Sequence, residues 1–371
     1  MNRHRARLFC AATIIMLGAV SPVLAQNYDT RIDNGAVSAA PLNQPVPLYP
    51  GRGIRAGQEG WVAVNFVITP DDNAIDPIIL DSSGGREFEE STREIISKWR
   101  FEAPGELRAN NTARIRFEIH RGKDLATSNF LRRSRRIVTH LFHEEFDEAR
   151  TLVDQALKIG GWNLYESTML WLMVGRVEGA EGNSAGKLEC YRRALGMGNS
   201  NALDDEDRRD LLSKLFELEI EHAQYASAKK TIRLLKREPG SQSDVESLQD
   251  KTVEMERALA AVQPMVATAT VFNASNSEEG EPIWSYVPAR RTFSFAALSG
   301  NVERFEVRCE RDRLQGLVEV DKTWSMPANA GNCQVFVFGD DGASFQFVEH
   351  SEAKSVDATG QTTVAKSDVL D

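Results

Sequence analysis

The sequence predicts an α+β protein built from three modules. Its first part alternates strand and helix patterns over about 80 residues, its middle part (124–263) carries helical periods, and its last part (265–350) returns to short strands. We therefore expect a small two-layer α/β sheet domain at 41–122, an α-helical repeat domain and a disulfide-containing, β-sandwich-like domain. The length of 371 residues is sufficient for three such units.

The charge balance excludes one class of partner. The chain has 44 basic and 54 acidic residues, which gives a formal net charge of −10. A protein that binds nucleic acid by neutralising phosphates needs the opposite balance, so we expect no nucleic-acid partner. An apolar fraction of 42% also excludes wholesale disorder.

The N-terminus indicates the compartment. Three arginines precede an apolar run, Leu8–Val20, and small residues lead up to Ala25-Gln26. This order predicts a signal peptide at 1–25, cleaved between Ala25 and Gln26, and therefore a periplasmic protein with no membrane span after cleavage. The alternative is an uncleaved inner-membrane anchor facing the periplasm, although a run of thirteen residues is short for a spanning helix, which needs about 20.

The first module has clear strand and helix periods. Residues 26–40 are polar and aperiodic, and we expect a linker there. The side chains of residues 60–68 alternate with a period of two, which predicts a strand. Residues 69–73 are rich in turn-forming residues, and residues 74–80 are expected to form a second strand. A helix follows, because the apolar stripe of Phe88, Thr92, Ile95 and Trp99 has helical spacing. A last strand spans 112–120.

Four motifs in this module lie in a fixed order: Tyr49-Pro50, the segment 60–66, Ser82-Ser83-Gly84, and Trp99-Arg100-Phe101 with Pro104. Together they resemble the TonB C-terminal domain family over residues 41–121. The resemblance implies a periplasmic domain that captures a short extended segment of an outer-membrane transporter beside its last strand. The physical basis is an open sheet edge whose unpaired N–H and C=O groups template a foreign strand.

The resemblance places the partner-binding edge on the last strand. We expect its backbone to hold the partner and its side chains to select it, with the candidate residues Arg114, Ile115, Arg116, Phe117, Glu118, Ile119 and His120. The expected partner is an envelope protein or an outer-membrane transporter peptide. An alternative is a membrane-anchored energy transducer of the TonB type.

The middle module is helical. The run Trp171–Gly175 is typical of the first helix of a tetratricopeptide repeat, and small residues recur where helices would pack closely. We expect degenerate repeats of this kind, whose concave groove gives a second interaction surface. An ordinary helical bundle is the alternative.

Three cysteines remain after signal cleavage. Cys309 and Cys333 are close in sequence, and an oxidising compartment favours a disulfide between them. Cys190 lies on a helical stretch and is expected to be a small buried residue, the alternative being a reactive thiol or an intermolecular link. Residues 351–371 lack aromatics and predict a disordered tail.

Candidate chemistry is sparse. Gly182, Ser184 and Gly186 match the G-x-S-x-G pattern of serine hydrolases, but between two helices the same residues make a turn. His140 and His143 are spaced differently from a zinc-binding H-E-x-x-H pair. The acidic cluster Asp71, Asp72, Asn73 and Asp76 suits a hairpin turn as well as a calcium ion.

One basic cluster stands out from this acidic chain. Arg132, Arg133, Arg135 and Arg136 lie on a predicted helix, where they would form a solvated face or dock an acidic partner or anionic lipid. Taken together, the sequence predicts a non-enzymatic binding protein with no catalytic residue, no metal and no cofactor. A hydrolase is the remaining alternative, and the oligomeric state is left open.

Overall fold

The computed structural model describes residues 27–351, except 84, 104, 121–125, 197–202, 273–280 and 321, and two short strand pieces beyond them. The predicted signal peptide and its cleavage site at Ala25-Gln26 lie outside these residues, as does most of the predicted tail. Of that tail, the structure describes the two-residue strands β15 (Ser355–Val356) and β16 (Thr362–Thr363), which pair with each other. None of the described helices is long and apolar enough to cross a bilayer.

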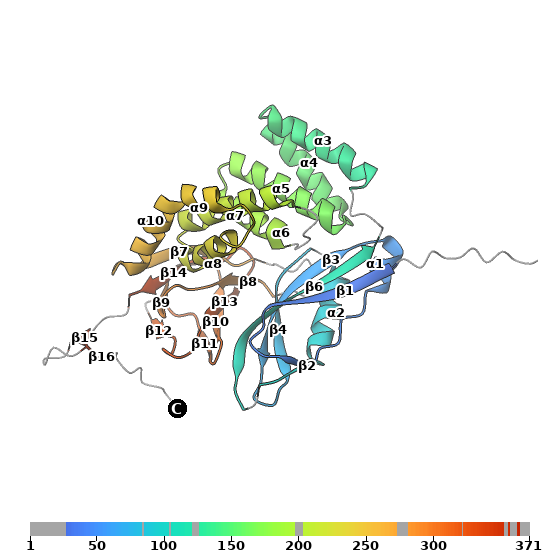
Figure 1. Cartoon of the computed structure of the whole chain (residues 1–371). Helices are drawn as coiled ribbons and strands as arrows, with labels where there is room; N and C mark the ends of the chain where they lie inside the picture. The colour runs from blue at the N-terminus through green and yellow to red at the C-terminus, as the bar shows by residue number, and fades with distance from the viewer. Residues whose placement is uncertain are drawn as a thin grey trace, which may run out of the picture.

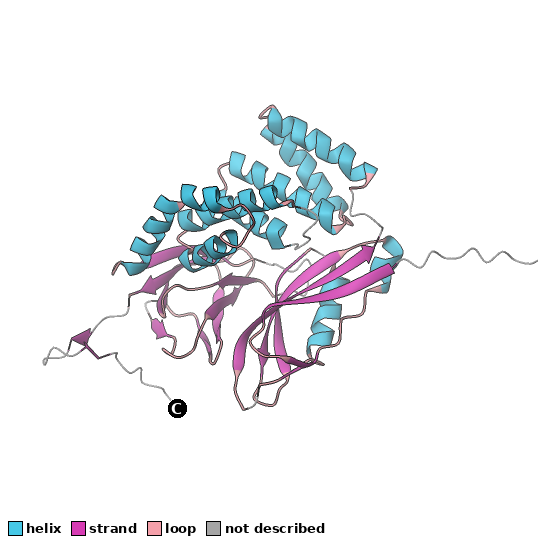
Figure 2. Cartoon of the chain, in the orientation of Figure 1, coloured by secondary structure: helices cyan, strands magenta, loops and turns pink. Residues whose placement is uncertain are grey.

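The first domain is a four-stranded antiparallel sheet with strand order β1-β6-β3-β4, backed by a helix (Figures 1 and 2). Its elements are β1 (Asn27–Ala36), β2 (Pro41–Asn43), α1 (Gly51–Ala56), β3 (Gly60–Ile68), β4 (Ala74–Ser82), α2 (Arg86–Ile96), β5 (Arg100–Phe101) and β6 (Arg108–His120). The predicted hairpin, helix and last strand are thus present, and residues 69–73 make the hairpin turn.

The core of this domain lies between the sheet and α2. Alternate residues of β3 and β6 point inward and meet the α2 stripe, so that Phe66, Phe88, Trp99 and Phe117 are almost fully buried. Aromatic edge contacts join them; the ring centroids of Phe66 and Trp99, for example, lie 5.4 Å apart. The Trp99 indole Nε1–H donates to the backbone oxygen of Pro45 at 2.9 Å, which satisfies its only polar group.

The prediction of a linker at 26–40 is wrong for most of its length, because residues 27–36 form β1. The strand does have a period of two, in which Tyr28, Thr30 and Ile32 alternate with Asp29, Arg31 and Asp33. The pattern is hard to recognise from sequence because half of these residues are charged. The strand pairs antiparallel with β6 from Asn27↔His120 to Asp33↔Arg114, and again at Ala36↔Thr112 after an irregularity.

The middle domain consists of helices that pack mainly against their neighbours in sequence. They are α3 (Ser128–Phe142), α4 (Phe146–Ile159), α5 (Leu164–Ala180), α6 (Ser184–Gly196), α7 (Asp205–Glu221), α8 (Tyr225–Leu235), α9 (Gln242–Ser247) and α10 (Gln249–Ala260). Gly175 permits the close approach of α5 and α6, because a Cβ there would lie 2.6 Å from the ring of Tyr191. Figure 1 shows this layer lying across both β-rich domains.

The last domain has two four-stranded antiparallel sheets, ordered β11-β10-β13-β8 and β12-β9-β14-β7. The strands are β7 (Met265–Thr270), β8 (Ile283–Tyr286), β9 (Thr292–Ser299), β10 (Val302–Cys309), β11 (Arg313–Leu317), β12 (Thr323–Ser325), β13 (Cys333–Gly339) and β14 (Ser344–His350). The two sheets share one aromatic core that includes Phe293, Phe305 and Phe347. The predicted disulfide is present: Cys309 and Cys333 are directly opposite on β10 and β13.

The outer face of the first sheet is covered by the other two domains. Trp61 and Ala63 of β3 pack with Leu164 and, at the edge of the cluster, Trp171 of α5. Ile78 and Leu80 of β4 pack against a second cluster formed by Ile283, Phe336 and Phe338 of the last domain. These contacts explain why every residue of β3 is buried, although only alternate residues face α2.

Candidate functional site

The predicted binding edge on β6 has a neighbour on both sides. Its Ile115 is opposite Val62 of β3 and opposite Ile32 of β1. The expectation of an open border at Thr112–His120 is therefore wrong for this structure, because the chain's own first strand occupies it. The border that a foreign backbone would complete is already completed by residues 27–36.

The predicted partner-selecting side chains divide between two faces. Ile115, Phe117 and Ile119 point into the core and are almost fully buried. Arg114, Arg116 and Glu118 alternate with them on the outer face, and the side chain of His120 lies outside the described part of the chain. The inward side chains of β6 thus belong to the core and cannot select a partner.

The outer-face arginines contact the chain itself. The guanidinium carbon of Arg114 lies 5.4 Å from the ring centroid of Trp61, and burial lowers the pKa of this guanidinium below its ordinary value. The Arg116 Nε is 3.7 Å from a carboxylate oxygen of Glu118. We expected these side chains to select the partner; they lie on the face of the sheet that packs with α5 of the helical domain.

Strand β1 is held mostly by its backbone. Of its residues with described side chains, 28–36, none is buried, and only Ile32 lies against the core as a half-buried neighbour. Tyr28 is 52% exposed and meets Tyr49 edge-on at 5.4 Å between ring centroids. Since apolar burial is the main source of stability, β1 contributes far less to the core than β3 or β6.

The opposite border, β4, is protected against strand addition. Pro77 removes a backbone donor there, and Asp76 has a positive φ of 50°, which interrupts the strand. Arg308 of the last domain donates to the backbone oxygen of Asp76 at 2.9 Å, and Arg313 forms an ion pair with its carboxylate at 2.6 Å. This border is therefore occupied by the protein's own third domain.

Glu59 connects the end of β6 to the helical domain. One of its carboxylate oxygens accepts from the backbone N–H of Ile119 at 2.9 Å, and the other accepts from the backbone N–H of Leu164 at 3.0 Å. Leu164 is the first residue of α5, where free N–H groups and the helix dipole favour a carboxylate. The sequence pattern did not single out Glu59, because a lone glutamate before a strand carries no signal of such a bridge.

A second connection joins Asp81 of β4 to Arg193 of α6. The Arg193 Nε lies 3.1 Å from a carboxylate oxygen of Asp81, and its guanidinium carbon stacks 4.7 Å from the ring centroid of Trp171. Burial raises the pKa of Asp81 to about 6, an effect that the nearby Arg193 charge reduces but does not cancel. At neutral pH this interface therefore contains an ionised carboxylate that burial disfavours.

Replacing Asp81 with Asn should change the pH dependence of stability. A carboxyl whose pKa is raised on folding stabilises the folded state fully below its unfolded pKa, and this contribution is lost as the pH rises through about 6. At pH 7.5 we expect Asp81→Asn to be more stable than the wild type by about 1–2 kcal/mol, a value reduced for the partial exposure of the side chain. Urea unfolding at pH 7.5 and pH 5 measures the difference, which should shrink at pH 5; a difference that does not change with pH would refute the assignment.

The sequence motifs for catalysis have structural roles in the folded chain. Ser184 Oγ lies 2.9 Å from His222 Nε2, a contact between the start of α6 and the end of α7, but among the described residues no carboxylate is hydrogen-bonded to this histidine. The neighbouring Gly182 has a φ of 79°, and the Asn183 side chain accepts from the backbone N–H of Gly186 at 3.0 Å. The residues of the G-x-S-x-G pattern thus form the turn before α6 and its N-terminal cap.

The candidate metal ligands are also engaged elsewhere. His140 Nδ1 lies 2.6 Å from a carboxylate oxygen of Glu145, and the His143 ring packs edge-on against Phe142. Asp72 accepts from the backbone N–H of Ala103 at 2.9 Å, as a turn residue does. Within the described part of the chain, no three His, Cys, Asp or Glu side chains come together as a metal site requires.

Cys190 is buried in the helical domain, as expected. Burial raises the pKa of its thiol to about 12, with nearby Glu178 as a smaller cause. Since the thiolate is the reactive form, this environment suppresses reactivity at neutral pH.

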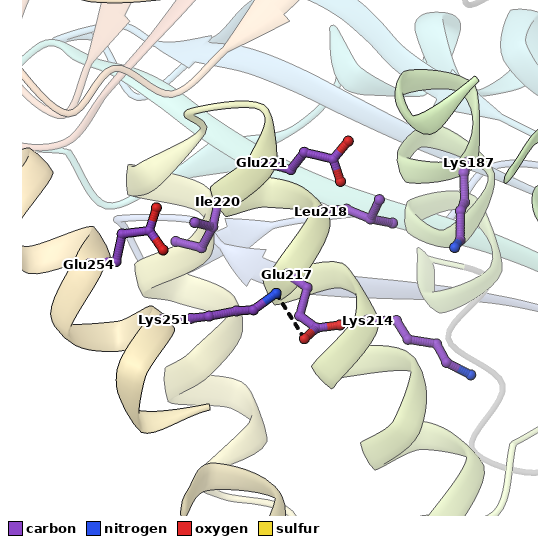
Figure 3. Close-up of a pocket in the computed structure, with 8 residues that line it drawn as sticks. All are labelled: Lys187, Lys214, Glu217, Leu218, Ile220, Glu221, Lys251 and Glu254. Atoms are coloured by element: carbon purple, nitrogen blue, oxygen red, sulfur yellow. Dashed lines mark ion pairs between the residues drawn. The ribbon is translucent and has the colours of Figure 1, made fainter. Parts of the chain in front are cut away.

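The helical domain contains a charged hollow with a volume of about 370 Å³ (Figure 3). Its lining residues come from α6, α7 and α10 and are Lys187, Lys214, Glu217, Leu218, Ile220, Glu221, Lys251 and Glu254. The Lys251 ammonium lies 3.0 Å from Glu217, which the dashed line in Figure 3 marks. The balance of three lysines and three glutamates suits a polar peptide segment better than a ligand of one charge.

Comparison with known proteins identifies the first domain. Residues 45–120, which include most of the sheet and α2, match one family model. That family is the Gram-negative bacterial TonB protein C-terminal. The predicted family resemblance is thereby confirmed for this TonB-like domain, whereas the match does not extend into the helical or last domain.

Two curated relatives agree with this match. Over 62 residues, or 17% of this chain, it is 40% identical to Protein TonB of Pseudomonas aeruginosa and 34% identical to Protein TonB of Yersinia enterocolitica. The match spans only 18% and 24% of the lengths of these relatives.

Two solved structures are similar to part of this chain. The solution NMR structure of the Pseudomonas aeruginosa TonB CTD is 30% identical, with 22% of this chain and 88% of that chain covered and a TM-score of 0.20. The TonB2 protein from Vibrio anguillarum is 23% identical, with coverages of 31% and 98% and again a TM-score of 0.20.

Proposed function

We propose that this chain is a periplasmic, non-enzymatic binding protein of the TonB type, which captures an extended peptide of an envelope partner by β-strand addition at β6. In the complex the peptide takes the place of β1, which pairs with the edge of β6 when no partner is bound. The hollow of the helical domain serves as a second interaction surface. No catalytic group, metal or cofactor takes part.

One observation carries the proposal: strand β1, which borders β6 on its outer side, has no buried side chain among its described residues. Its replacement by another extended backbone restores the same ladder of hydrogen bonds and exposes little apolar surface. The opposite border offers no such possibility, because Pro77 and the contacts of Arg308 and Arg313 occupy it.

The TonB-like match supports an envelope partner. Both curated relatives bear the name Protein TonB, and the family model that covers this sheet is the C-terminal part of the same protein. The predicted signal peptide supports a location in the periplasm, where such a partner would be met.

The proposal is tested with a variant that lacks residues 27–36 and a synthetic peptide of that sequence. We expect the peptide to bind the variant, and to bind the wild type at least about tenfold more weakly, because the tethered strand competes at a high effective concentration. Fluorescence anisotropy of the labelled peptide measures the affinity, and circular dichroism verifies that the variant is folded.

Two N-methylated peptides provide the matched controls. Since β1 has a neighbour on one side only, alternate N–H groups of the peptide point toward β6 and the others toward solvent. One peptide is methylated at Tyr28, Thr30 and Ile32, and the other at Asp29, Arg31 and Asp33. One of the two should lose binding and the other retain it; equal binding of both, or no binding of the unmodified peptide to a folded variant, would refute strand addition.

A further inference from the structure

Helix α3 has an unusual outer face. Its buried residues are Phe130 and Ile137, which pack on α4 and α5. On the side next to this buried face, Leu131, Val138 and Phe142 are 42%, 46% and 81% exposed. Their spacing of i, i+7 and i+11 places them in one stripe along the helix.

Helix α3 also carries a cluster of positive charge. Residues 126–143 contain four arginines and no aspartate or glutamate, in a chain whose net charge is −10. None of the four arginines takes part in the ion pairs found among the described residues; Arg132 and Arg133 only approach the side-chain oxygen of Asn129, at 3.4 and 3.3 Å. Arg135 lies beside the apolar stripe, and the exposed Arg132 and Arg136 lie farther round the helix on the same side of it.

The position of α3 in the molecule leaves this face open. It is the first helix of the helical layer and lies at its outer end in Figure 1. No described element packs on its stripe, as the exposure of Phe142 shows.

A chain of hydrogen bonds places the start of α3 near the start of β1. Thr127, the cap of α3, donates its backbone N–H to Glu166 of α5 at 2.7 Å, and α5 begins at Leu164, which donates to Glu59. Glu59 also binds Ile119 of β6, which is paired with Tyr28. The apolar segment Leu8–Val20, predicted to be a signal peptide or membrane anchor, precedes β1 in sequence.

We propose that the outer face of α3 docks on the surface of an anionic phospholipid bilayer. The apolar stripe enters the boundary between headgroups and acyl chains, and the guanidinium groups on one side of it reach the lipid phosphates. An acidic protein partner would satisfy the arginines, but the combination of arginines with an exposed aromatic on one stripe is typical of a helix that lies in a membrane interface.

The test is flotation of the chain beginning at Gln26 with vesicles of phosphatidylcholine alone and of phosphatidylcholine with about one third phosphatidylglycerol. We expect binding to the anionic vesicles only, and a loss of about a hundredfold in partitioning for the triple variant Arg132→Gln, Arg135→Gln, Arg136→Gln, at roughly a factor of five per arginine. Phe142→Ser should weaken binding as well, by about tenfold.

The matched control neutralises three exposed cations on α8: Lys229→Gln, Lys230→Gln and Arg233→Gln. It changes the net charge equally and should bind like the wild type. No binding of the wild type, which is the result expected if the face serves an acidic protein, would overturn the proposal. An equal loss in both triple variants would also overturn it, because binding would then depend on net charge alone.

Discussion

Replacing Arg308 with alanine should lower the free energy of unfolding by about 3–5 kcal/mol, the range for removing one member of a buried ion pair. The side chain is 1% exposed, and its Nε lies 2.5 Å from Glu306, which is itself almost fully buried. Its Nη1 donates to the Asn65 side chain at 3.0 Å and to the backbone oxygen of Asp76 at 2.9 Å. Alanine would leave the fully buried Asn65 side-chain oxygen without this donor. It would also remove one of the partners of Glu306, which among the described residues then keeps only Arg313 and Gln315.

The effect should extend beyond stability, because Arg308 joins two domains. It lies on β10 of the last domain, whereas Asn65 and Asp76 belong to the TonB-like sheet. We expect the sheet of Arg308→Ala to become sensitive to limited proteolysis near β4 before the protein unfolds.

Urea denaturation of Arg308→Ala and of Arg304→Ala measures the stability effect. Arg304 lies on the same strand and pairs with Glu281 at 2.6 Å, but it is 38% exposed, so its loss should cost less than about 1 kcal/mol. If Arg308→Ala were no more destabilising than Arg304→Ala, the buried network would not couple the domains.

Strand β1 should open far more often than the rest of its sheet. Local opening costs a free energy that depends on the apolar contacts broken, and the described side chains of β1 include no buried one, whereas every residue of β3 is buried. We expect amide protection in β1 to be at least about a hundredfold lower than in β3. This difference is what makes β1 replaceable by a partner strand.

The sequence predicted the elements whose patterns are strong. Strand β3 has a period of two and helix α2 has the stripe of Phe88, Thr92 and Ile95, because both elements bury one face in the same core. Such periods can be recognised from a short stretch of sequence alone. The disulfide was predicted from the expected oxidising compartment and the short separation of Cys309 and Cys333. The TonB-like domain was predicted from its four sequence motifs.

What the sequence could not predict depends on contacts between distant segments. Residues 27–36 carry mixed charges, so their strand period is concealed, and only the pairing with β6 makes them a strand. Arg114 and Arg116 look like solvent-facing residues of an edge strand, and only the packing of the helical domain explains their position. The burial of Arg308 likewise depends on Asn65, 243 residues away.

The most direct test of the central claim is native-state hydrogen exchange, followed by NMR or mass spectrometry, of the amides in β1, β3 and β4. Strand β4 is the internal control, because it is also a terminal strand of the sheet but has buried side chains such as Ile79. The account predicts that β1 exchanges by local opening, well before β4 and β3. Protection of β1 equal to that of β3 would contradict it, since β1 would then be a fixed part of the sheet.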